Sequence, residues 1–115
     1  MALHLRTSEA LHLMHDVAFD LVHEAVHDFS MRQLAILFTV YLDPPPHTVR
    51  ALAAKLDVTK PVITRALDTM GALGLVDRKR DPDDLRNVII QRTAKGALFV
   101  EHFGDVMVAR GKALS

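Results

Sequence analysis

The segment from Thr48 to Leu75 constrains the fold of this chain more than any other part of its sequence. It reads TVRALAAKLDVTKPVITRALDTMGALGL, and apolar residues recur at three- and four-residue spacing on either side of residues 57–59. A threonine precedes each apolar run as a possible N-cap, and Pro61 stands in the first turn of the second run, where a missing N–H is tolerated. Gly74 supplies the positive-φ residue that ends many helices. We therefore predict two helices joined by a short turn.

The side chains of this segment fit a helix-turn-helix. Ala53 is small enough for the second helix to approach the first, Val58 fills the turn, and Ile63 with its neighbours faces the first helix. The candidate DNA-contacting residues on the opposite, polar side are Thr59, Lys60, Thr64 and Arg65. In a helix-turn-helix this half of the second helix enters a DNA major groove. An ordinary α-helical hairpin with a solvated polar face has the same pattern and stays open as an alternative.

Charge is distributed unevenly along a chain that is neutral overall. Fourteen Lys and Arg balance 14 Asp and Glu within 115 residues. Arg6 is the one basic side chain of this kind before Ser30, whereas eight lie between Lys55 and Arg92. The positive charge thus falls on the helix-turn-helix and the segment after it, as a phosphate-facing surface requires. The length favours one domain with a single core.

Composition also excludes several classes of function. The sequence has no cysteine, which excludes a disulfide framework, a thiol nucleophile and a thiolate metal site. The N-terminus lacks the basic and then apolar pattern of a signal peptide, and no apolar run approaches the ~18–20 residues that a membrane span needs. We expect a cytoplasmic protein with no membrane contact and no cofactor.

Residues 7–28 predict a long amphipathic helix whose apolar face must pack on the domain or on a second copy. It contains His23, Glu24 and His27 in an H-E-x-x-H pattern, which in metalloproteases holds zinc and activates water. Catalysis also needs a third ligand and a cleft, and the residues after His27 do not extend the motif. We therefore expect no enzyme. The histidines are interpreted as a solvated or interface face, with a regulatory metal site as the alternative hypothesis.

Two further helices are predicted around this centre. Residues 30–42 predict a largely buried helix with Ser30 as its N-cap, ended by the prolines at 44–46. Residues 94–111 predict a last helix capped by Thr93.

A β-hairpin is predicted between the helix-turn-helix and the last helix. Residues 75–80 and 87–91 form two short extended runs separated by an Asp- and Pro-rich turn. The candidate phosphate-contacting residues of this wing are Arg78, Lys79, Arg80 and Arg86. Because the turn is acidic, we expect some of its carboxylates to pair with the arginines, with the holding of Arg86 in place as one role. The predicted fold class is mainly α with a small β-hairpin, a winged helix-turn-helix.

This order of elements resembles the MarR family of winged-helix transcriptional regulators over about residues 30–96. Three stretches carry the likeness, at residues 52–67, 73–78 and 81–96. The last is the most specific, since the D-x-R of the wing keeps the family's spacing to the T-x-x-G that opens the next helix. The resemblance implies that Thr59, Lys60, Thr64 and Arg65 lie on the recognition helix, that Asp84 braces the wing, and that Arg86 contacts DNA at or near the minor groove.

The chain also departs from the family's pattern. Arg92 stands where leucine is usual, and the wing is acidic. Family members are commonly longer, and their terminal helices interlock into a dimer, so we expect dimerisation here to fall to the first and last helices. The expected organisation is a single domain, 1–115, with an N-terminal dimerisation-type helix at 1–29, a DNA-binding lobe at 30–93 with its wing at 75–92, and a C-terminal helix at 94–115.

The sequence supports one functional hypothesis and one alternative. The hypothesis is a homodimeric, sequence-specific regulator that binds double-stranded DNA, in which basic side chains neutralise phosphates while Thr59 and Thr64 reach base edges. The alternative is a winged-helix protein-interaction module that modulates another regulator without binding DNA itself. The neutral net charge and the acidic wing keep it open, and a small-molecule effector is also left open.

Overall fold

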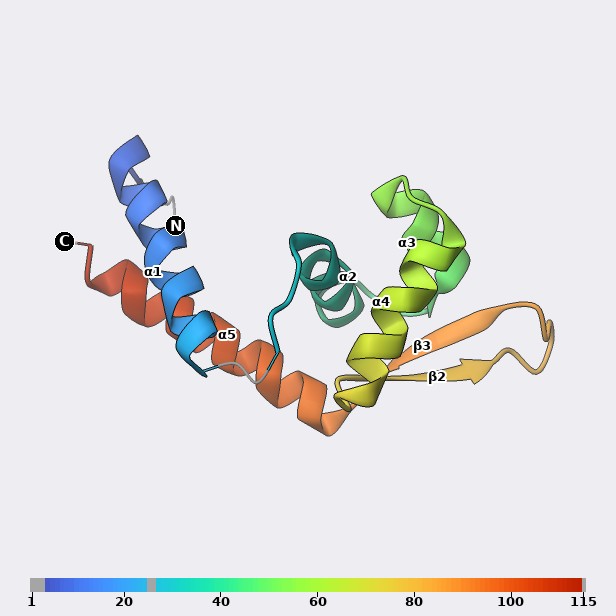
Figure 1. Cartoon of the computed structure of the whole chain (residues 1–115). Helices are drawn as coiled ribbons and strands as arrows, with labels where there is room; N and C mark the ends of the chain where they lie inside the picture. The colour runs from blue at the N-terminus through green and yellow to red at the C-terminus, as the bar shows by residue number, and fades with distance from the viewer. Residues whose placement is uncertain (1–3, 25–26, 115) are drawn as a thin grey trace. The chain divides into compact units, whose positions relative to one another are not determined.

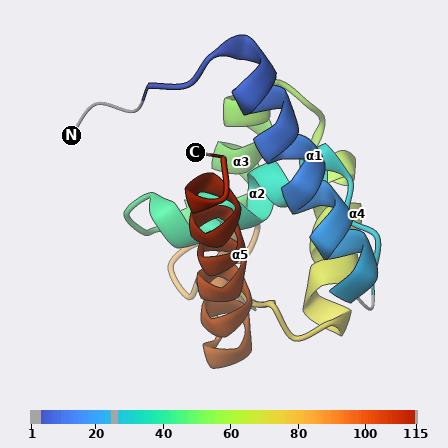
Figure 2. The same ribbon diagram turned by 90° about the vertical axis from the view of Figure 1, so that its left-hand side faces the viewer.

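The structure is a computed structural model, and it describes residues 4–24 and 27–114. Its elements in chain order are α1 (Thr7–Glu24), α2 (Met31–Leu42), β1 (His47–Thr48), α3 (Val49–Leu56), α4 (Lys60–Ala72), β2 (Val76–Arg80), β3 (Val88–Arg92) and α5 (Ala94–Lys112) (Figure 1). They fall into two compact units. The winged-helix lobe is residues 29–100, and the terminal unit is the described residues on either side of it. α5 runs as one helix from the lobe into the terminal unit (Figure 2).

The two helices of the helix-turn-helix begin and end where the sequence predicts. Thr48 caps α3, and its Oγ1 accepts a hydrogen bond from a backbone amide three residues later at 3.0 Å. α4 begins at Lys60, with Pro61 in its first turn. Gly74 follows the end of α4 with a φ of 77°, a conformation that glycine adopts without a Cβ clash.

The turn between α3 and α4 is short because Asp57 adopts the left-handed conformation, with a φ of 54°. Aspartate visits this region more readily than most residues that carry a Cβ. The backbone amides of Asp57 and Val58 donate to the last carbonyls of α3, the second of them to the Ala53 oxygen at 3.0 Å. Three residues therefore suffice to turn the chain and begin α4.

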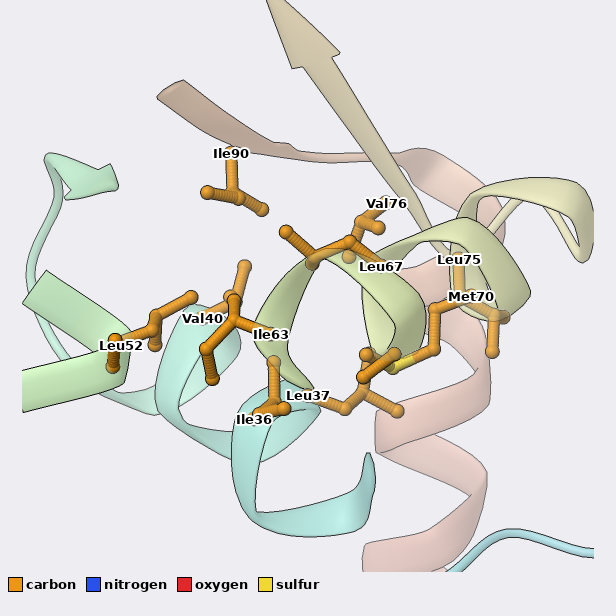
Figure 3. Close-up of a cluster of buried hydrophobic side chains, with 12 residues drawn as sticks. Ile36, Leu37, Val40, Leu52, Ile63, Leu67, Met70, Leu75, Val76 and Ile90 are labelled. Carbon is orange, nitrogen blue, oxygen red and sulfur yellow. The ribbon is translucent and has the colours of Figure 1, made fainter. Parts of the chain in front are cut away.

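The core of the lobe lies where α2, α3 and α4 meet the sheet. Figure 3 shows side chains from all these elements pointing toward one another. The buried cluster is Ile36, Leu37, Val40, Leu52, Ala53, Ile63, Ala66, Leu67, Met70, Leu75, Val76 and Ile90, and Val58 packs against it from the turn. The predicted docking of α4 on α3 through small and branched residues is confirmed.

The wing is part of a three-stranded antiparallel sheet, with strand order β1-β3-β2. The predicted hairpin is confirmed as β2 and β3, but the two-residue β1 was not predicted. His47 of β1 pairs with Ile90 of β3 and is buried, with its Nε2 3.0 Å from the Asp43 carbonyl oxygen. Burial of the imidazole is tolerated because this hydrogen bond satisfies its polar edge.

The first helix is shorter than predicted. α1 ends at Glu24, His27 and Asp28 are not helical, and the intervening residues 25–26 lie outside the described part of the chain. His23 Nδ1 is 3.0 Å from the Phe19 carbonyl oxygen, and Glu24 is bound to a residue of α5. Within the described residues, no group of three or more His, Cys, Asp or Glu is placed to hold a metal ion.

Ion pairs join α1 to α5 inside the terminal unit. Arg110 donates two hydrogen bonds of 2.6 Å to the Asp20 carboxylate, and these bonds lower the pKa of Asp20. His102 Nε2 lies 2.6 Å from Glu24 Oε2, and this hydrogen bond raises the pKa of His102 above its ordinary 6.5. None of the helices in the described residues is long and apolar enough to cross a membrane.

The hydroxyl of Tyr41 joins α2 to both ends of the wing and to α5. It donates to the Leu75 carbonyl oxygen at 2.6 Å and accepts from the Thr93 amide at 2.9 Å. Thr93 Oγ1 in turn donates to the Gly74 carbonyl oxygen at 2.7 Å and accepts from the Gly96 amide at 2.9 Å, so it caps α5 as predicted. A Cβ on Gly96 would overlap the Tyr41 hydroxyl and the Leu75 carbonyl. The backbone of α5 can therefore lie this close to Tyr41 only because residue 96 is glycine.

We expect opposite outcomes when two glycines of α5 are replaced by alanine. Helix propensity alone favours alanine by about 1 kcal/mol. Gly104→Ala should gain about this amount, because nothing lies within 4 Å of the added Cβ. Gly96→Ala should instead lower the free energy of unfolding by at least about 2 kcal/mol, because the backbone must move away from Tyr41. Urea unfolding followed by circular dichroism measures both, and equal stability of the two variants would contradict the Tyr41 junction.

Candidate nucleic-acid interface

The first half of α4 carries exposed polar side chains on the side opposite its buried face. The exposed positions are Thr59, Lys60, Thr64 and Arg65, the four residues that the sequence assigns to DNA contact. Thr59 occupies the N-cap position, yet its side chain makes no capping hydrogen bond. Lys60 and Arg65 form no salt bridge within the described residues. This surface therefore offers hydroxyls and cations that the lobe itself does not use.

A shallow hollow of about 210 Å³ lies between the start of α2 and α4. Its lining residues are Ser30, Arg32, Gln33, Val62, Arg65, Ala66 and Thr69. Ser30 and Gln33 are already engaged in the capping box that begins α2. Ser30 Oγ accepts a hydrogen bond from the Gln33 amide at 3.0 Å, and Gln33 Oε1 accepts one from the Ser30 amide at 2.8 Å. Arg65 thus lies at the edge of the hollow as well as on the exposed half of α4.

Strand β2 presents its basic residues on two different faces of the sheet. Alternation along the strand places Arg78 on the same face as the buried Val76, and Lys79 on the other. Arg78 Nη1 lies 2.8 Å from Asp68 Oδ1 of α4, and its side chain is about one-third exposed. This ion pair fastens β2 to α4. Of the two basic residues, Lys79 is the one left on the outer face.

The acidic residues of the wing turn accept hydrogen bonds from the turn itself. Asp81 Oδ1 accepts from the Asp83 amide at 2.9 Å, and its other oxygen accepts from the Asn87 side chain at 3.3 Å. These two bonds, the first above all, lower the pKa of Asp81. Asp84 Oδ1 accepts from the Arg86 amide at 3.1 Å. Two of the three carboxylates in the turn are thus side-chain acceptors that shape it.

Leu85 and Arg86 are exposed neighbours in the second half of the wing turn. Arg86 Nε lies 3.3 Å from Asp84 Oδ1, while 88% of its side chain stays exposed. Leu85 is 65% exposed, and its carbonyl oxygen accepts a hydrogen bond of 2.7 Å from Arg80 Nη1. This half of the turn therefore presents one cation and one apolar side chain, on a backbone that hydrogen bonds hold in place. Figure 1 shows this hairpin projecting from the lobe.

Arg92 caps the C-terminus of α2. Its Nε donates to the Val40 carbonyl oxygen and its Nη2 to the Asp43 carbonyl oxygen, both at 2.8 Å. The guanidinium carbon also lies 5.9 Å from the centre of the Tyr41 ring. The last carbonyls of a helix lack helical partners and favour a cation. The arginine that departs from the expected leucine therefore has a structural role, at the base of the wing.

A family model describes this arrangement. The model of the MarR family matches residues 29–88, which is more than half of the chain. The chain belongs to the MarR family. Proteins of this family are non-enzymatic DNA-binding transcription factors, so the chain is a transcriptional regulator and not an enzyme. The matched residues include the helix-turn-helix and most of the wing.

Solved structures of similar fold cover nearly the whole chain. A mutant of MepR from S. aureus bound to an oligodeoxyribonucleotide has a TM-score of 0.79 and 22% identity, covering 91% of this chain and 75% of that one. CouR, a transcriptional repressor bound to a 23-mer DNA duplex, has a TM-score of 0.72 and 21% identity, with 92% and 72% covered. The transcriptional regulator BldR from Sulfolobus solfataricus has a TM-score of 0.61 and 28% identity, with 92% and 81% covered. No curated protein sequence matches the chain.

These likenesses confirm the predicted fold class, a mainly helical winged helix-turn-helix. Sequence reasoning missed β1, the Asp68–Arg78 ion pair and the cap that Arg92 provides. Asp68, at the start of the third turn of α4, and Arg78 in β2 are ten positions apart, so no local spacing rule connects them. For Arg92, the replacement of the usual leucine by arginine was the signal in the sequence that could have indicated a structural role.

We expect Arg92→Leu, which restores the usual leucine, to lower the free energy of unfolding by about 1–2 kcal/mol. Two carbonyl oxygens at the end of α2 would lose charge-assisted hydrogen bonds, and partial exposure keeps the loss below that of a buried pair. Arg50→Leu, at an exposed position of α3, is the matched control and should change stability by less than about 0.5 kcal/mol. Equal stability of the two variants in urea unfolding would contradict the capping role.

Proposed function

We propose that this regulator binds double-stranded DNA sequence-specifically, with α4 in a major groove and the tip of the β2–β3 hairpin in the neighbouring minor groove. The observation that carries the proposal is the pairing, on one lobe, of an exposed polar half of α4 with an Arg86 that Asp84 holds at the wing tip. The MepR mutant and CouR, which share the fold, were solved with DNA.

The residues divide into those that contact DNA and those that position them. Lys60 and Arg65 neutralise phosphates, because the described structure gives them no internal carboxylate partner. Thr59 and Thr64 reach base edges or thymine methyl groups from α4. Arg86 enters the minor groove, where negative potential is strongest when the groove is narrow.

The remaining basic residues of the wing have mixed roles in this proposal. Arg78 positions β2, since Asp68 already compensates its charge, and Arg80 holds the Leu85 carbonyl. Lys79 lies on the outer face of the hairpin and contributes a phosphate contact.

The interaction-module alternative was motivated by the acidic wing. In the structure, the carboxylates of Asp81 and Asp84 are occupied by hydrogen bonds within the turn. Their main effect is thus on the shape of the tip, and of the three carboxylates in the turn Asp83 is the exposed one. The acidic sequence of the turn therefore no longer favours a protein partner over DNA.

Arg86→Ala should weaken DNA binding by about 1–3 kcal/mol and reduce the slope of log K against log salt by about 1, because one phosphate-region cation is lost. Fluorescence anisotropy at several salt concentrations measures both, on a duplex that the parent chain selects from a random-sequence library. Asp84→Ala keeps the Arg86 cation but removes the carboxylate that holds it in place. We therefore expect a smaller loss of DNA affinity than for Arg86→Ala, with the slope of log K against log salt unchanged.

Arg6→Ala is the matched control, because it removes an arginine from the terminal unit, where it pairs with Glu9. It should leave the affinity unchanged. If Arg86→Ala bound the selected duplex as tightly as the parent, the assignment of the wing would be wrong.

We further propose that the working form is a homodimer built through the terminal unit. Its exposed apolar side chains are Leu11, Met14, Phe19, Val22, Met107 and Val108, each between 41% and 71% exposed. They come from α1 and from the second half of α5, and a cluster of this kind on a small unit is a common mark of an interface. Homodimers are typical of the family. A two-fold dimer would present two copies of α4 to two half-sites of one operator.

Val22→Glu should convert the dimer to monomer at concentrations where the parent is dimeric, because a buried unpaired carboxylate opposes association. Ser8→Glu adds the same charge at an exposed position in the first turn of α1 and should leave the dimer intact. Sedimentation equilibrium distinguishes the two. A parent chain that sediments as a monomer at all concentrations would refute the proposed interface.

A further inference from the structure

Leu85 is an exposed leucine in the turn of a hairpin whose other exposed side chains, apart from Pro82, are polar. Its neighbours in the sequence are Asp84 and Arg86, and 65% of its surface is exposed. Single exposed leucines are common on protein surfaces and need no explanation by themselves. This one differs in two respects. It adjoins the cation assigned to the minor groove, and its backbone is fixed.

Hydrogen bonds on both sides hold the Leu85 backbone. Arg80 Nη1 donates to its carbonyl oxygen at 2.7 Å. The amide of Asp84 donates to the Asp81 carbonyl at 3.2 Å, and the amide of Asn87 donates to the Asp84 carbonyl at 2.8 Å. The first of these bonds closes a turn at residues 81–84, and the second closes a turn at residues 84–87 that contains Leu85. A side chain on such a backbone keeps its place when the tip meets a surface, so less conformational entropy is lost on binding.

The carboxylates next to Leu85 do not compete for that surface. Asp81 is engaged with the Asp83 amide and the Asn87 side chain, and Asp84 with Arg86. Asp83, like Pro82, is exposed in the first half of the turn. The second half of the turn thus presents an exposed leucine beside an exposed arginine.

A minor groove matches this pair of side chains chemically. Phosphates on both rims and the acceptors on its floor attract a guanidinium, while the deoxyribose walls are largely C–H surface. Other minor-groove proteins insert leucine and similar apolar side chains there. The guanine amino group projects from the floor, so an apolar side chain lying on the floor favours A·T pairs over G·C pairs.

We propose that Leu85 is a specificity-determining residue, which selects A·T pairs where the wing enters the minor groove by occupying the space that a purine 2-amino group would fill. This inference rests on the proposed DNA-binding function. Arg86 supplies affinity through charge at the same place, and Leu85 supplies discrimination through volume.

The test uses base analogues that alter the minor groove alone. The probe is a duplex that the whole parent chain selects from a random-sequence library. Adenines are replaced one at a time by 2,6-diaminopurine, which adds a minor-groove amino group and leaves the major-groove edge of adenine unchanged. We expect the parent to lose about tenfold in affinity at a short run of positions, since a wrong base pair in a site typically has an effect of this size.

Leu85→Ser should reduce that loss to less than about threefold at the same positions, because serine leaves room for the amino group and accepts a hydrogen bond from it. Leu98→Ser, at a leucine of α5 that is 67% exposed, is the matched control and should keep the full loss. Arg86→Ala should weaken binding to modified and unmodified duplexes alike. Thermal unfolding of each variant checks that the fold is retained.

Two results would overturn the role of Leu85 while leaving DNA binding intact. One is a tenfold loss that persists in Leu85→Ser, which would assign the discrimination to Arg86 or to groove width. The other is a parent chain that tolerates diaminopurine at every position. Failure of the parent to select any duplex would instead overturn the proposed function, and this inference with it.

Discussion

One hydroxyl group connects the parts of the winged-helix lobe that lie far apart in sequence. Tyr41 Oη, near the end of α2, bonds to Leu75 where β2 begins and to Thr93 where β3 ends, across separations of 34 and 52 residues. These backbone groups are partly buried, so losing the hydroxyl would leave a donor and an acceptor without partners. Gly96 lets α5 start against the same hydroxyl. The direction in which the wing and α5 leave the core therefore depends on this junction.

The sequence predicts most of the lobe because its signals are local. Caps at Thr48 and Ser30, the proline at the start of α4 and the glycine after its end each act over a few residues, and each is found where it was expected. The features that were missed depend on pairing across the fold. A two-residue strand has no periodicity to detect, and β1 exists only because β3 lies beside it. Tyr41 lies in a segment that the sequence predicts only as a largely buried helix, since nothing near it in the sequence indicates its distant partners.

The candidate site shows the same division. The exposed half of α4 follows from helical periodicity, so the sequence identifies which residues face outward. Periodicity says nothing about the charge that such residues retain in the folded chain. Arg78 and Arg86 are equivalent in the sequence as wing arginines, but the first is about one-third exposed beside Asp68 and the second is almost fully exposed beside Asp84. Acidic residues that look unfavourable for a DNA-binding wing turn out to be acceptors within its turn, because aspartate bonds readily to amides two residues ahead.

A neutral net charge is consistent with a polyanionic partner, because many carboxylates are paired with basic residues while some cations on α4 are not. Several carboxylates of the lobe and the terminal unit are bound to basic residues, as in Asp43 with Lys55 and Asp20 with Arg110. Such pairs contribute little field at a distance of more than about 10 Å in salt. The local field over α4 is then set by cations such as Lys60. In the proposed DNA complex, such a charge distribution would attract DNA weakly from afar, and the affinity would come chiefly from direct contact. In the proposed complex, discrimination at contact, by base edges in one groove and by shape in the other, would therefore have a larger share in the binding than in a strongly basic protein.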